Sequence, residues 1–273
     1  MRIAVIGVGL IGGSVALAAR EQAGAHVSGH DRDPEVLEHA LGLGLLDRAC
    51  ATVAEALEEA DAAFVAVPVG ALPAAVAAVL EAAPPDCVVT DVGSVKRALV
   101  ASVDDRRFVG GHPLAGTEHS GASHARADLF DGATWYLTPT GVSSPELYES
   151  LCELLTSLGA RPEAIDAHDH DRLMATVSHL PHVLANVLVA QASAVGVVPG
   201  ATAPSFRDAI RVAGAPSTIW TDIYLQNADL LCLAIERTVG GLEEFRDALA
   251  DADAGRIRQL NEAAAAARRE LLS

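Results

Sequence analysis

Residues 1–22 read MRIAVIGVGLIGGSVALAAREQ, and this stretch decides the fold. A short apolar run, Ile3–Ile6, leads directly into a turn where Gly7, Gly9 and Gly12 stand in the spacing GxGxxG, and a segment of helical length follows. Strand, glycine-rich turn and helix in this order form a dinucleotide-binding fingerprint, with the pyrophosphate at the helix N-terminus. In it, Gly7 permits the tight turn, Gly9 lets the backbone approach the pyrophosphate, and Gly12 lets helix and strand pack closely.

An acidic residue at a suitable distance supports this interpretation. Asp31 follows an expected second strand, His26–His30, and stands 19 residues after Gly12. Its carboxylate can accept both ribose hydroxyls and favours NAD over NADP, although the neighbouring Arg32 could pair with a 2′-phosphate. A second turn, Val67-Pro68, ends another expected strand and is expected to cover the nicotinamide-side ribose. The expected cofactor-binding residues are Gly7, Gly9, Leu10, Ile11, Gly12, Asp31, Arg32, Val67, Pro68 and Ser94.

Short β-branched runs alternate with helical segments as far as about residue 165, which predicts βαβ units and a parallel sheet. The runs IAVIG and FVAVP are continuously apolar, as buried parallel strands are. The fold class is therefore α/β: a Rossmann-type, doubly wound, mostly parallel sheet with a second, all-helical dimerisation domain. We expect a nucleotide-binding domain over 1–166 and a helical substrate and dimerisation domain over 167–273. The expected helices of the second domain are 168–196, 204–213, 216–237, 239–251 and 254–271.

The chain of 273 residues carries 36 acidic against 19 basic side chains, a formal net charge of −17. No nucleic-acid partner is expected, because affinity for nucleic acid depends on Lys and Arg neutralising phosphates. A polybasic membrane anchor is excluded for the same reason. The four cysteines form no CxxC pair, and the N-terminus shows no basic leader or cleavage pattern. A soluble, cytoplasmic protein is predicted.

The longest apolar stretch, Val183–Val198, predicts an oligomer. It is shorter than the ~20 residues of a membrane-spanning helix, and Asn186 and Gln191 interrupt it. A helix that is apolar around most of its circumference must be buried on nearly all sides. The small helical domain cannot supply that cover alone, so we expect a homodimer whose helices pack across a two-fold axis.

Two polar motifs follow expected strands and predict a catalytic site. DVGSVK at 91–96 contains Ser94, and GHPLAGTE at 111–118 contains His112. The carboxyl ends of strands form the ligand crevice of an open α/β sheet, so both side chains should face the nicotinamide. The pKa of histidine suits proton transfer near neutrality, and Ser94 could orient His112 or the substrate hydroxyl. The open alternatives are a loop histidine satisfied by the backbone and a serine that caps a helix.

Other histidines invite a metal interpretation. His179 and His182 are three residues apart and share a helical face, but no third ligand stands at a suitable spacing. His168-Asp169-His170-Asp171 alternates around a helix start, where acidic groups favour the dipole, and is predicted to be a solvated helix N-terminus. No metal is therefore expected.

These motifs together resemble the prephenate and arogenate dehydrogenase family. The resemblance rests on GVGLIGGS, DVGSVK, GGHPLAGTEHSG, SHLPH at 178–182, and FRDAIR at 206–211 followed by Pro216 and Trp220. It implies a Rossmann domain with a helical dimerisation domain, His112 as the catalytic base and Ser94 as its partner. The substrate-binding residues that it implies are His179, His182, Arg211, Thr117, Glu118 and Trp220, although a structural role for His179 and Trp220 stays open.

The implied activity is NAD-dependent oxidative decarboxylation of prephenate. Removing the C4 hydroxyl proton assists hydride transfer, and the ring carboxylate then leaves as CO₂ with aromatisation. The two substrate carboxylates call for a planar bidentate donor such as Arg211. Arogenate and an amino-substituted prephenate remain alternative substrates, and a non-catalytic NAD-sensing module is the alternative of another class.

Overall fold

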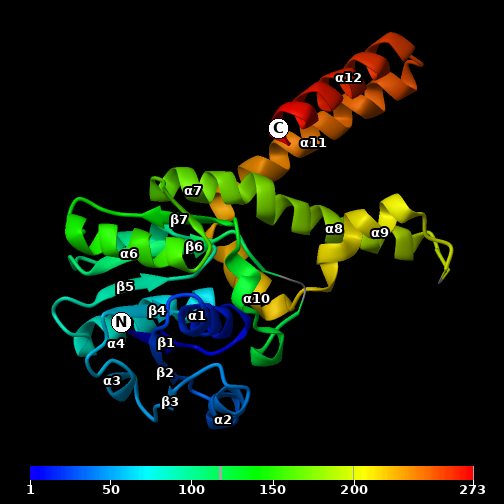
Figure 1. Cartoon of the computed structure of the whole chain (residues 1–273). Coiled ribbons are helices and arrows are strands. Elements are labelled where there is room, and N and C mark those ends of the chain that lie inside the picture. Colours follow the sequence, from blue (N-terminus) through cyan, green and yellow to red (C-terminus); the bar gives the residue numbers. More distant parts are fainter. Residues whose placement is uncertain (117–118, 199, 273) are drawn as a thin grey trace. The chain divides into compact units, whose positions relative to one another are not determined.

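The computed structural model describes residues 1–116, 119–198 and 200–272. The chain forms two compact units, Met1–Asn227 and Ala228–Ser273 (Figure 1). The first unit contains the sheet and the residues proposed from the sequence for cofactor and substrate. The second is a pair of helices. The domain boundary expected at 166/167 remains a prediction, since the compact units divide at a different point.

The first unit is built on one eight-stranded sheet in the order β3-β2-β1-β4-β5-β6-β7-β8. All neighbouring strands are parallel except β6 and β7, which are antiparallel. This confirms the mostly parallel, Rossmann-type sheet, although the two-residue β3 was not expected. The strands are β1 (Arg2–Ile6), β2 (His26–His30), β3 (Arg48–Ala49), β4 (Ala62–Val65), β5 (Val88–Asp91), β6 (Phe108–Pro113), β7 (Thr134–Thr138) and β8 (Arg161–Ala164).

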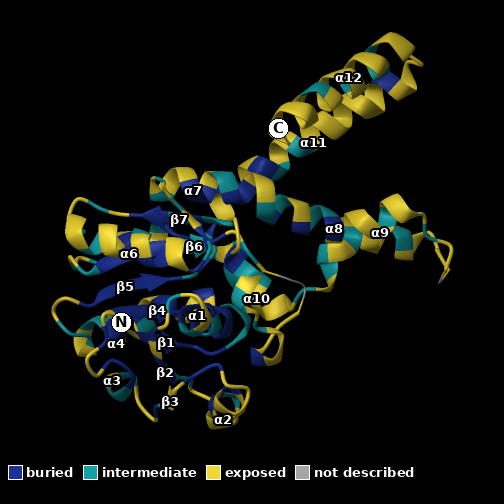
Figure 2. Ribbon diagram, in the orientation of Figure 1, coloured by how far each residue is buried: buried dark blue, intermediate teal, exposed yellow. Residues whose placement is uncertain are grey.

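Helices cover both faces of the sheet, because successive side chains of a strand point to opposite faces. Along β1, Ile3 and Val5 join one apolar core with α1, α2 and α6, whereas Ala4 and Ile6 join another with α3, α4 and α5. Figure 2 shows the strands between them as buried. The elements are α1 (Leu10–Glu21), α2 (Pro34–Gly42), α3 (Val53–Ala56), η1 (Val69–Ala71), α4 (Leu72–Ala82), α5 (Arg97–Ala101), η2 (Ala122–His124), η3 (Ala127–Phe130) and α6 (Pro145–Ser157).

The chain after the sheet is helical, as predicted, but the breaks between helices differ. The expected helices 216–237 and 239–251 are wrong: one helix ends at Gln226, and the next begins at Ala228 and runs through Gly240. Buried Asn227 makes the break, since its side chain leaves the helix direction to bond to α7 and η4. The elements are α7 (Ala167–Met174), the π-helical turn η4 (Ala175–His179), α8 (Leu180–Ala194), α9 (Pro204–Ile210), η5 (Arg211–Gly214), α10 (Ser217–Gln226), α11 (Ala228–Ala250) and α12 (Ala254–Leu271).

Elements α7, η4 and α8 form one continuous helical run, Ala167–Ala194. By length and composition alone it would suffice to cross a membrane, because an 18-residue window within it has a mean hydropathy of 1.5. The core helix of a soluble protein meets the same criterion, and the first part of this run holds buried polar groups that bond to the sheet. Burial on all sides is not found within one chain, because the apolar side chains Val187, Leu188 and Val189 are exposed (Figure 2).

Candidate active site

The glycine-rich turn between β1 and α1 has the geometry of a phosphate cradle. Gly7 has φ +94°, and a Cβ on Gly12 would collide with the Gly7 carbonyl, so larger residues do not fit there. A Cβ on Gly9 would meet no protein atom within 4 Å, which leaves the outer side of the turn open. No side chain caps the N-terminus of α1, so its first N–H groups are available to an anion. These features fit a dinucleotide.

Asp31 follows β2 and is hydrogen-bonded to this turn. Its Oδ2 accepts a hydrogen bond from the Val8 N–H at 2.9 Å, and its Oδ1 accepts one from the Asp33 N–H at 3.0 Å. The carboxylate is half-buried beside the turn, where a ribose bound next to the cradle could reach it, whereas Arg32 is exposed. The other expected cofactor residues lie on the same edge: Leu10 and Ile11 are half-buried in the first turn of α1, and Val67 and Pro68 link β4 to η1.

Ser94 and His112 lie at the carboxyl ends of two neighbouring parallel strands, β5 and β6. Both side chains are half-buried. Ser94 does not cap a helix, because α5 begins after Lys96 and has no side-chain cap. His112 is not satisfied by the backbone: its Nδ1 lies 2.9 Å from Nε2 of His170, on α7. The structure thus places the two residues as expected and adds an unexpected partner.

His170 and Asp171 are fully buried, which corrects the prediction of a solvated helix N-terminus. Only His168 and Asp169 of that motif are exposed. Nδ1 of His170 lies 2.8 Å from Oδ1 of Asp171, so the order Asp171, His170, His112 forms a hydrogen-bonded chain. The prediction failed because both residues are polar, and only the contact with β6 shows that they point inward.

Asp171 also binds the segment that follows Ser94. Its two carboxylate oxygens accept hydrogen bonds from the backbone N–H groups of Lys96, at 2.8 Å, and Arg97, at 3.0 Å. The Lys96 side chain is fully buried, forms an ion pair with Asp91 and donates to the carbonyl of Gly111 at 2.8 Å. This is the only lysine of the chain. These bonds tie the ends of β5 and β6 to the start of α7.

The surroundings of this chain of residues keep His112 neutral. Burial lowers the pKa of His112 well below 6.5, and the neighbouring His170, Lys96 and His179 lower it further. Burial alone would raise the pKa of Asp171, but hydrogen bonds from His170 and from the backbone of Arg97 and Lys96 outweigh it and lower that pKa. A neutral imidazole beside an ionised carboxylate network can accept a proton near neutral pH.

His179 and His182 both present buried N–H groups. The Asn227 amide must point its nitrogen at the Asp171 carbonyl, at 2.8 Å, and that nitrogen also lies 3.2 Å from Nδ1 of His179. Nδ1 of His179 is therefore an acceptor, and the proton is on Nε2. Among the described residues, Nε2 of neither histidine makes a hydrogen bond of regular geometry. Each is a donor that is ready for a ligand oxygen.

Aromatic and amide side chains from neighbouring turns hold His182 in place. Its Nδ1 is bonded to the Tyr224 hydroxyl and lies 3.3 Å from the Asn186 amide nitrogen. Its ring stacks on Trp220 with centroids 3.7 Å apart. Burial lowers the pKa of His182, and the backbone of Val212 raises it by less. Burial likewise lowers the pKa of His179, to about 4.

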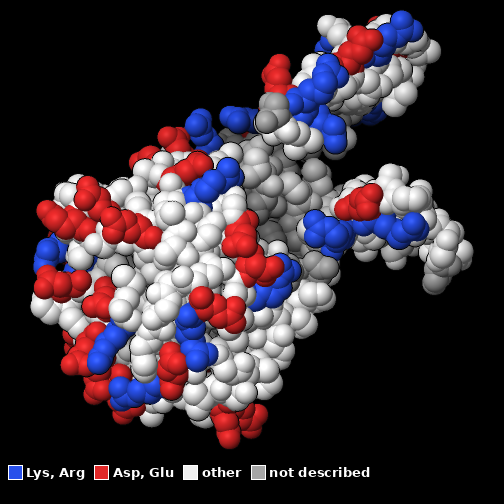
Figure 3. All heavy atoms as spheres, viewed as in Figure 1, with Lys and Arg blue, Asp and Glu red and all other residues white. Residues whose placement is uncertain are grey.

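Of the remaining predicted substrate residues, Arg211 is exposed at the start of η5, the residue before Val212. Thr117 and Glu118 lie outside the described residues. Among the residues that the structure does describe, no group of three or more His, Cys, Asp or Glu side chains could hold a metal ion. Acidic and basic side chains are interspersed on the face shown in Figure 3.

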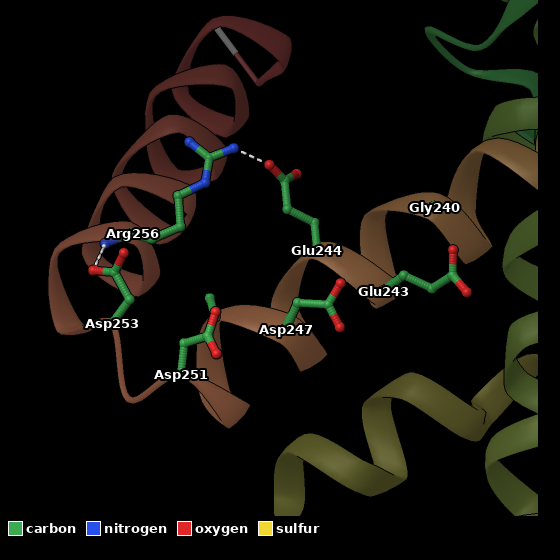
Figure 4. A pocket seen from close by; sticks show the side chains of 8 residues that line it. Gly240, Glu243, Glu244, Asp247, Asp251, Asp253 and Arg256 are labelled. Atoms are coloured by element: carbon green, nitrogen blue, oxygen red, sulfur yellow. Dashed lines mark hydrogen bonds and ion pairs between the residues drawn. The ribbon is translucent and has the colours of Figure 1, made fainter.

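A surface hollow of about 430 Å³ lies within the second compact unit, and none of these residues lines it. Acidic side chains of α11 line it, and Arg256 of α12 pairs with Glu244 while its backbone N–H bonds to Asp253 (Figure 4). The hollow is open, most of its lining side chains are acidic, and the Arg256 guanidinium is paired with Glu244, so it does not suit a dinucleotide or an anionic substrate. It is therefore not the active site.

Sequence reasoning missed His170, Asp171, Tyr224 and Asn227. One signal could have found Asp171. Asp171, Ala175, His179 and His182 follow one another at spacings of three or four, so they share a helical face with the two predicted histidines. All four are buried.

The two halves of the chain match two models of one protein family. Residues 15–164 match the nucleotide-binding domain of prephenate dehydrogenase, and residues 166–262 match its dimerization domain. Cyclohexadienyl dehydrogenase from Zymomonas mobilis is 34% identical over 261 residues, covering 92% of this chain and 89% of that protein. Prephenate dehydrogenase from Bacillus subtilis is 31% identical over 263 residues, covering 92% and 71%.

A solved structure is similar over nearly the whole chain. The crystal structure of prephenate dehydrogenase from A. aeolicus, in complex with hydroxyphenyl propionate and NAD⁺, superposes with a TM-score of 0.91. The two sequences are 27% identical, and the match covers 99% of this chain and 98% of that one. Both the sheet and the helices that follow it are therefore shared with that enzyme.

Proposed function

The chain belongs to the prephenate dehydrogenase family, and from this premise we propose that it catalyses the NAD-dependent oxidative decarboxylation of prephenate to 4-hydroxyphenylpyruvate, in tyrosine biosynthesis. The observation that carries the proposal is His112: a half-buried imidazole at the end of β6, kept neutral by its surroundings, beside an open dinucleotide cradle.

NAD is the cofactor, and it supplies the acceptor for the hydride that leaves C4 of the substrate. The turn Gly7–Gly12 and the N-terminus of α1 would hold its pyrophosphate, and Asp31 would accept the adenosine ribose hydroxyls. The solved relative is in complex with NAD⁺. The choice of NAD over NADP rests on Asp31, because its carboxylate would repel a 2′-phosphate.

His112 takes the proton of the C4 hydroxyl, and Ser94 hydrogen-bonds the same oxygen. The dienone that forms loses its ring carboxylate as CO₂, and the electron pair of the broken C–C bond leaves a phenolate at that oxygen. His112 then returns its proton to the phenolate. The proton therefore moves out and back between one oxygen and one nitrogen, and His112 acts first as base and then as acid.

The substrate carboxylates are bound from the helical segment. His179 and His182 supply neutral N–H donors from buried positions, and the planar guanidinium of Arg211 supplies the charge. Trp220 holds the ring of His182 and so orients its donor.

The protein acts as a cytoplasmic homodimer. The exposed apolar residues of α8, Val187, Leu188 and Val189, support this, since a monomer would leave them in water. The match of residues 166–262 to a dimerization domain supports it as well.

The test is to incubate the purified chain with NAD⁺ and either prephenate or arogenate, and to follow NADH by absorbance. We expect NADH and CO₂ with prephenate. If only arogenate were turned over, arogenate would be the substrate, and the type of reaction would stay as proposed. Binding of NAD without turnover of either compound would instead identify a non-catalytic NAD-sensing module and overturn the proposal.

A further inference from the structure

In the hydrogen-bonded chain of Asp171, His170 and His112, the donor and the acceptor of each bond can be assigned. An ionised carboxylate only accepts hydrogen bonds, so Nδ1 of His170 must carry the proton that it shares with Asp171, at 2.8 Å. In a neutral His170, Nε2 is then an acceptor. Nδ1 of His112, 2.9 Å away, must carry a proton in turn. This leaves the lone pair of His112 on Nε2.

Charged side chains next to this chain of residues are paired with one another. Asp91 and Asp171 are each fully buried and carry one negative charge. The Lys96 ammonium pairs with Asp91, and the Arg97 guanidinium lies 3.5 Å from Asp171. Each of the two buried carboxylates is therefore paired with a basic side chain.

The orientation of His170 is also fixed from the sides. Its ring meets the edge of the His112 ring, with centroids 5.1 Å apart and planes at 74°. On the other side it meets the ring of Tyr136, with centroids 5.9 Å apart and planes at 83°. Tyr136 is the register partner of His112 across β6 and β7, so both contacts come from one position of the sheet.

We propose that His170 and Asp171 are positioning residues of this enzyme: they hold His112 in the tautomer with its proton on Nδ1, so that Nε2 is the proton acceptor. This inference rests on the proposed function. Asp171 does a second task, because the same carboxylate accepts the backbone N–H groups of Lys96 and Arg97. One side chain thereby positions both the base His112 and the segment that carries Ser94.

The sequence offers matched controls within one motif. His168 and Asp169 have the same residue types on the same helix, but both are exposed and neither touches His112. We compare His170→Leu with His168→Leu, and Asp171→Asn with Asp169→Asn. His170→Gln is the rescue variant, because its amide can donate to Asp171 and accept from Nδ1 of His112.

The first readout is steady-state kinetics with prephenate and NAD⁺. We expect His170→Leu to lower kcat by about 10²–10⁴-fold with KM changed less than about threefold, as for a general base in the wrong tautomer. Asp171→Asn should lower kcat in the same range, and His170→Gln should restore it to within about tenfold of the unmodified chain. The two control variants should leave kcat unchanged. A folded His170→Leu protein with unchanged kcat would overturn the proposal.

The second readout does not depend on activity. Nitrogen-15 NMR of labelled histidines reports which ring nitrogen carries the proton, and loss of one signal in His112→Asn assigns it. We expect the Nδ1–H tautomer of His112 in the unmodified chain and in His170→Gln, and a shift toward Nε2–H in His170→Leu. An Nε2–H tautomer in the unmodified chain would refute the positioning role even if the enzyme oxidises prephenate. The expected tautomer in a chain that leaves prephenate unchanged would instead refute the proposed function alone.

Discussion

The two ends of the helical run Ala167–Ala194 differ in burial, and in each the burial is the opposite of what the side chains' polarity would predict. The first end is polar in sequence, yet His170, Asp171 and His179 are fully buried and bonded to the sheet or to neighbouring helices. The second end is apolar, yet Leu188 and Val189 are exposed. Burial of polar groups is costly unless every group is hydrogen-bonded, and exposed apolar faces mark contact surfaces. We therefore propose that the polar end serves catalysis and that the apolar end serves assembly.

The largest effect on kcat is expected from replacing His112, the residue to which the polar end is hydrogen-bonded through His170. His112→Asn should lower kcat by about 10²–10⁴-fold with little change in KM, because asparagine can still donate to His170 but has no basic nitrogen. Steady-state kinetics with prephenate measures it. A kcat within a few-fold of the unmodified chain would show that another group removes the proton.

Breaking the apolar end should separate the subunits. Leu188→Asp should raise the dissociation constant of the dimer by about 10²-fold or more, because an uncompensated carboxylate in an apolar interface costs on the order of 3 kcal/mol. Sedimentation analysis at several concentrations measures the change. Leu41→Asp on α2 is the matched control, since Leu41 and Leu188 are 41% and 42% exposed. If both variants stay dimeric, α8 is not the interface.

A smaller effect is expected where η5 packs against α8. Arg211→Ala should raise KM for prephenate by about 10- to 100-fold and change kcat less, because a charge-assisted hydrogen bond contributes about 1.5–3 kcal/mol. Arg207→Ala, on neighbouring α9, is the control: that guanidinium bonds to the Thr202 carbonyl, and its loss should leave KM unchanged. An unchanged KM in Arg211→Ala would exclude that arginine as a substrate ligand.

The smallest expected effect is on the pH dependence of the free energy of unfolding. It separates the two ends, because the buried His179 lies at the polar end. The pKa of His179 is about 4 in the folded chain and 6.5 ordinarily, so between these values the unfolded chain binds a proton that the folded chain does not. The free energy of unfolding should therefore fall as pH drops below about 6.5, by up to ~1.4 kcal/mol per pH unit. His112 and His182 add in the same direction. Urea unfolding at several pH values measures this, and His179→Gln should reduce the slope.

The sequence was sufficient to predict the elements whose signal is local. The turn Gly7–Gly12, the run IAVIG and the polar strand ends at Ser94 and His112 all have short-range patterns, and the sheet has the predicted class. The break at Asn227 was missed because asparagine alone does not end a helix. Its side chain leaves the helix only because Asp171 and His179 offer it partners that are distant in the sequence.

The polar end of the helical run was missed for a related physical reason. Charged and polar residues at a helix start are usually solvated, and nothing local distinguishes His168 from His170. What distinguishes them is the Nδ1 of His112, which stands 58 positions away from His170 along the chain. The need of the apolar end for a partner was predicted from a local signal, its apolar periodicity, and it stays a prediction that the exposed side chains Val187, Leu188 and Val189 support.

The stacking of Trp220 on His182 gives the protein an internal optical probe. The chain has two tryptophans, and the other, Trp135, is fully buried between Phe64 and Phe130 in the sheet unit. A protonated imidazole quenches the emission of an indole in van der Waals contact. The fluorescence of Trp220 should therefore report the charge on the neighbouring His182 imidazole without any label.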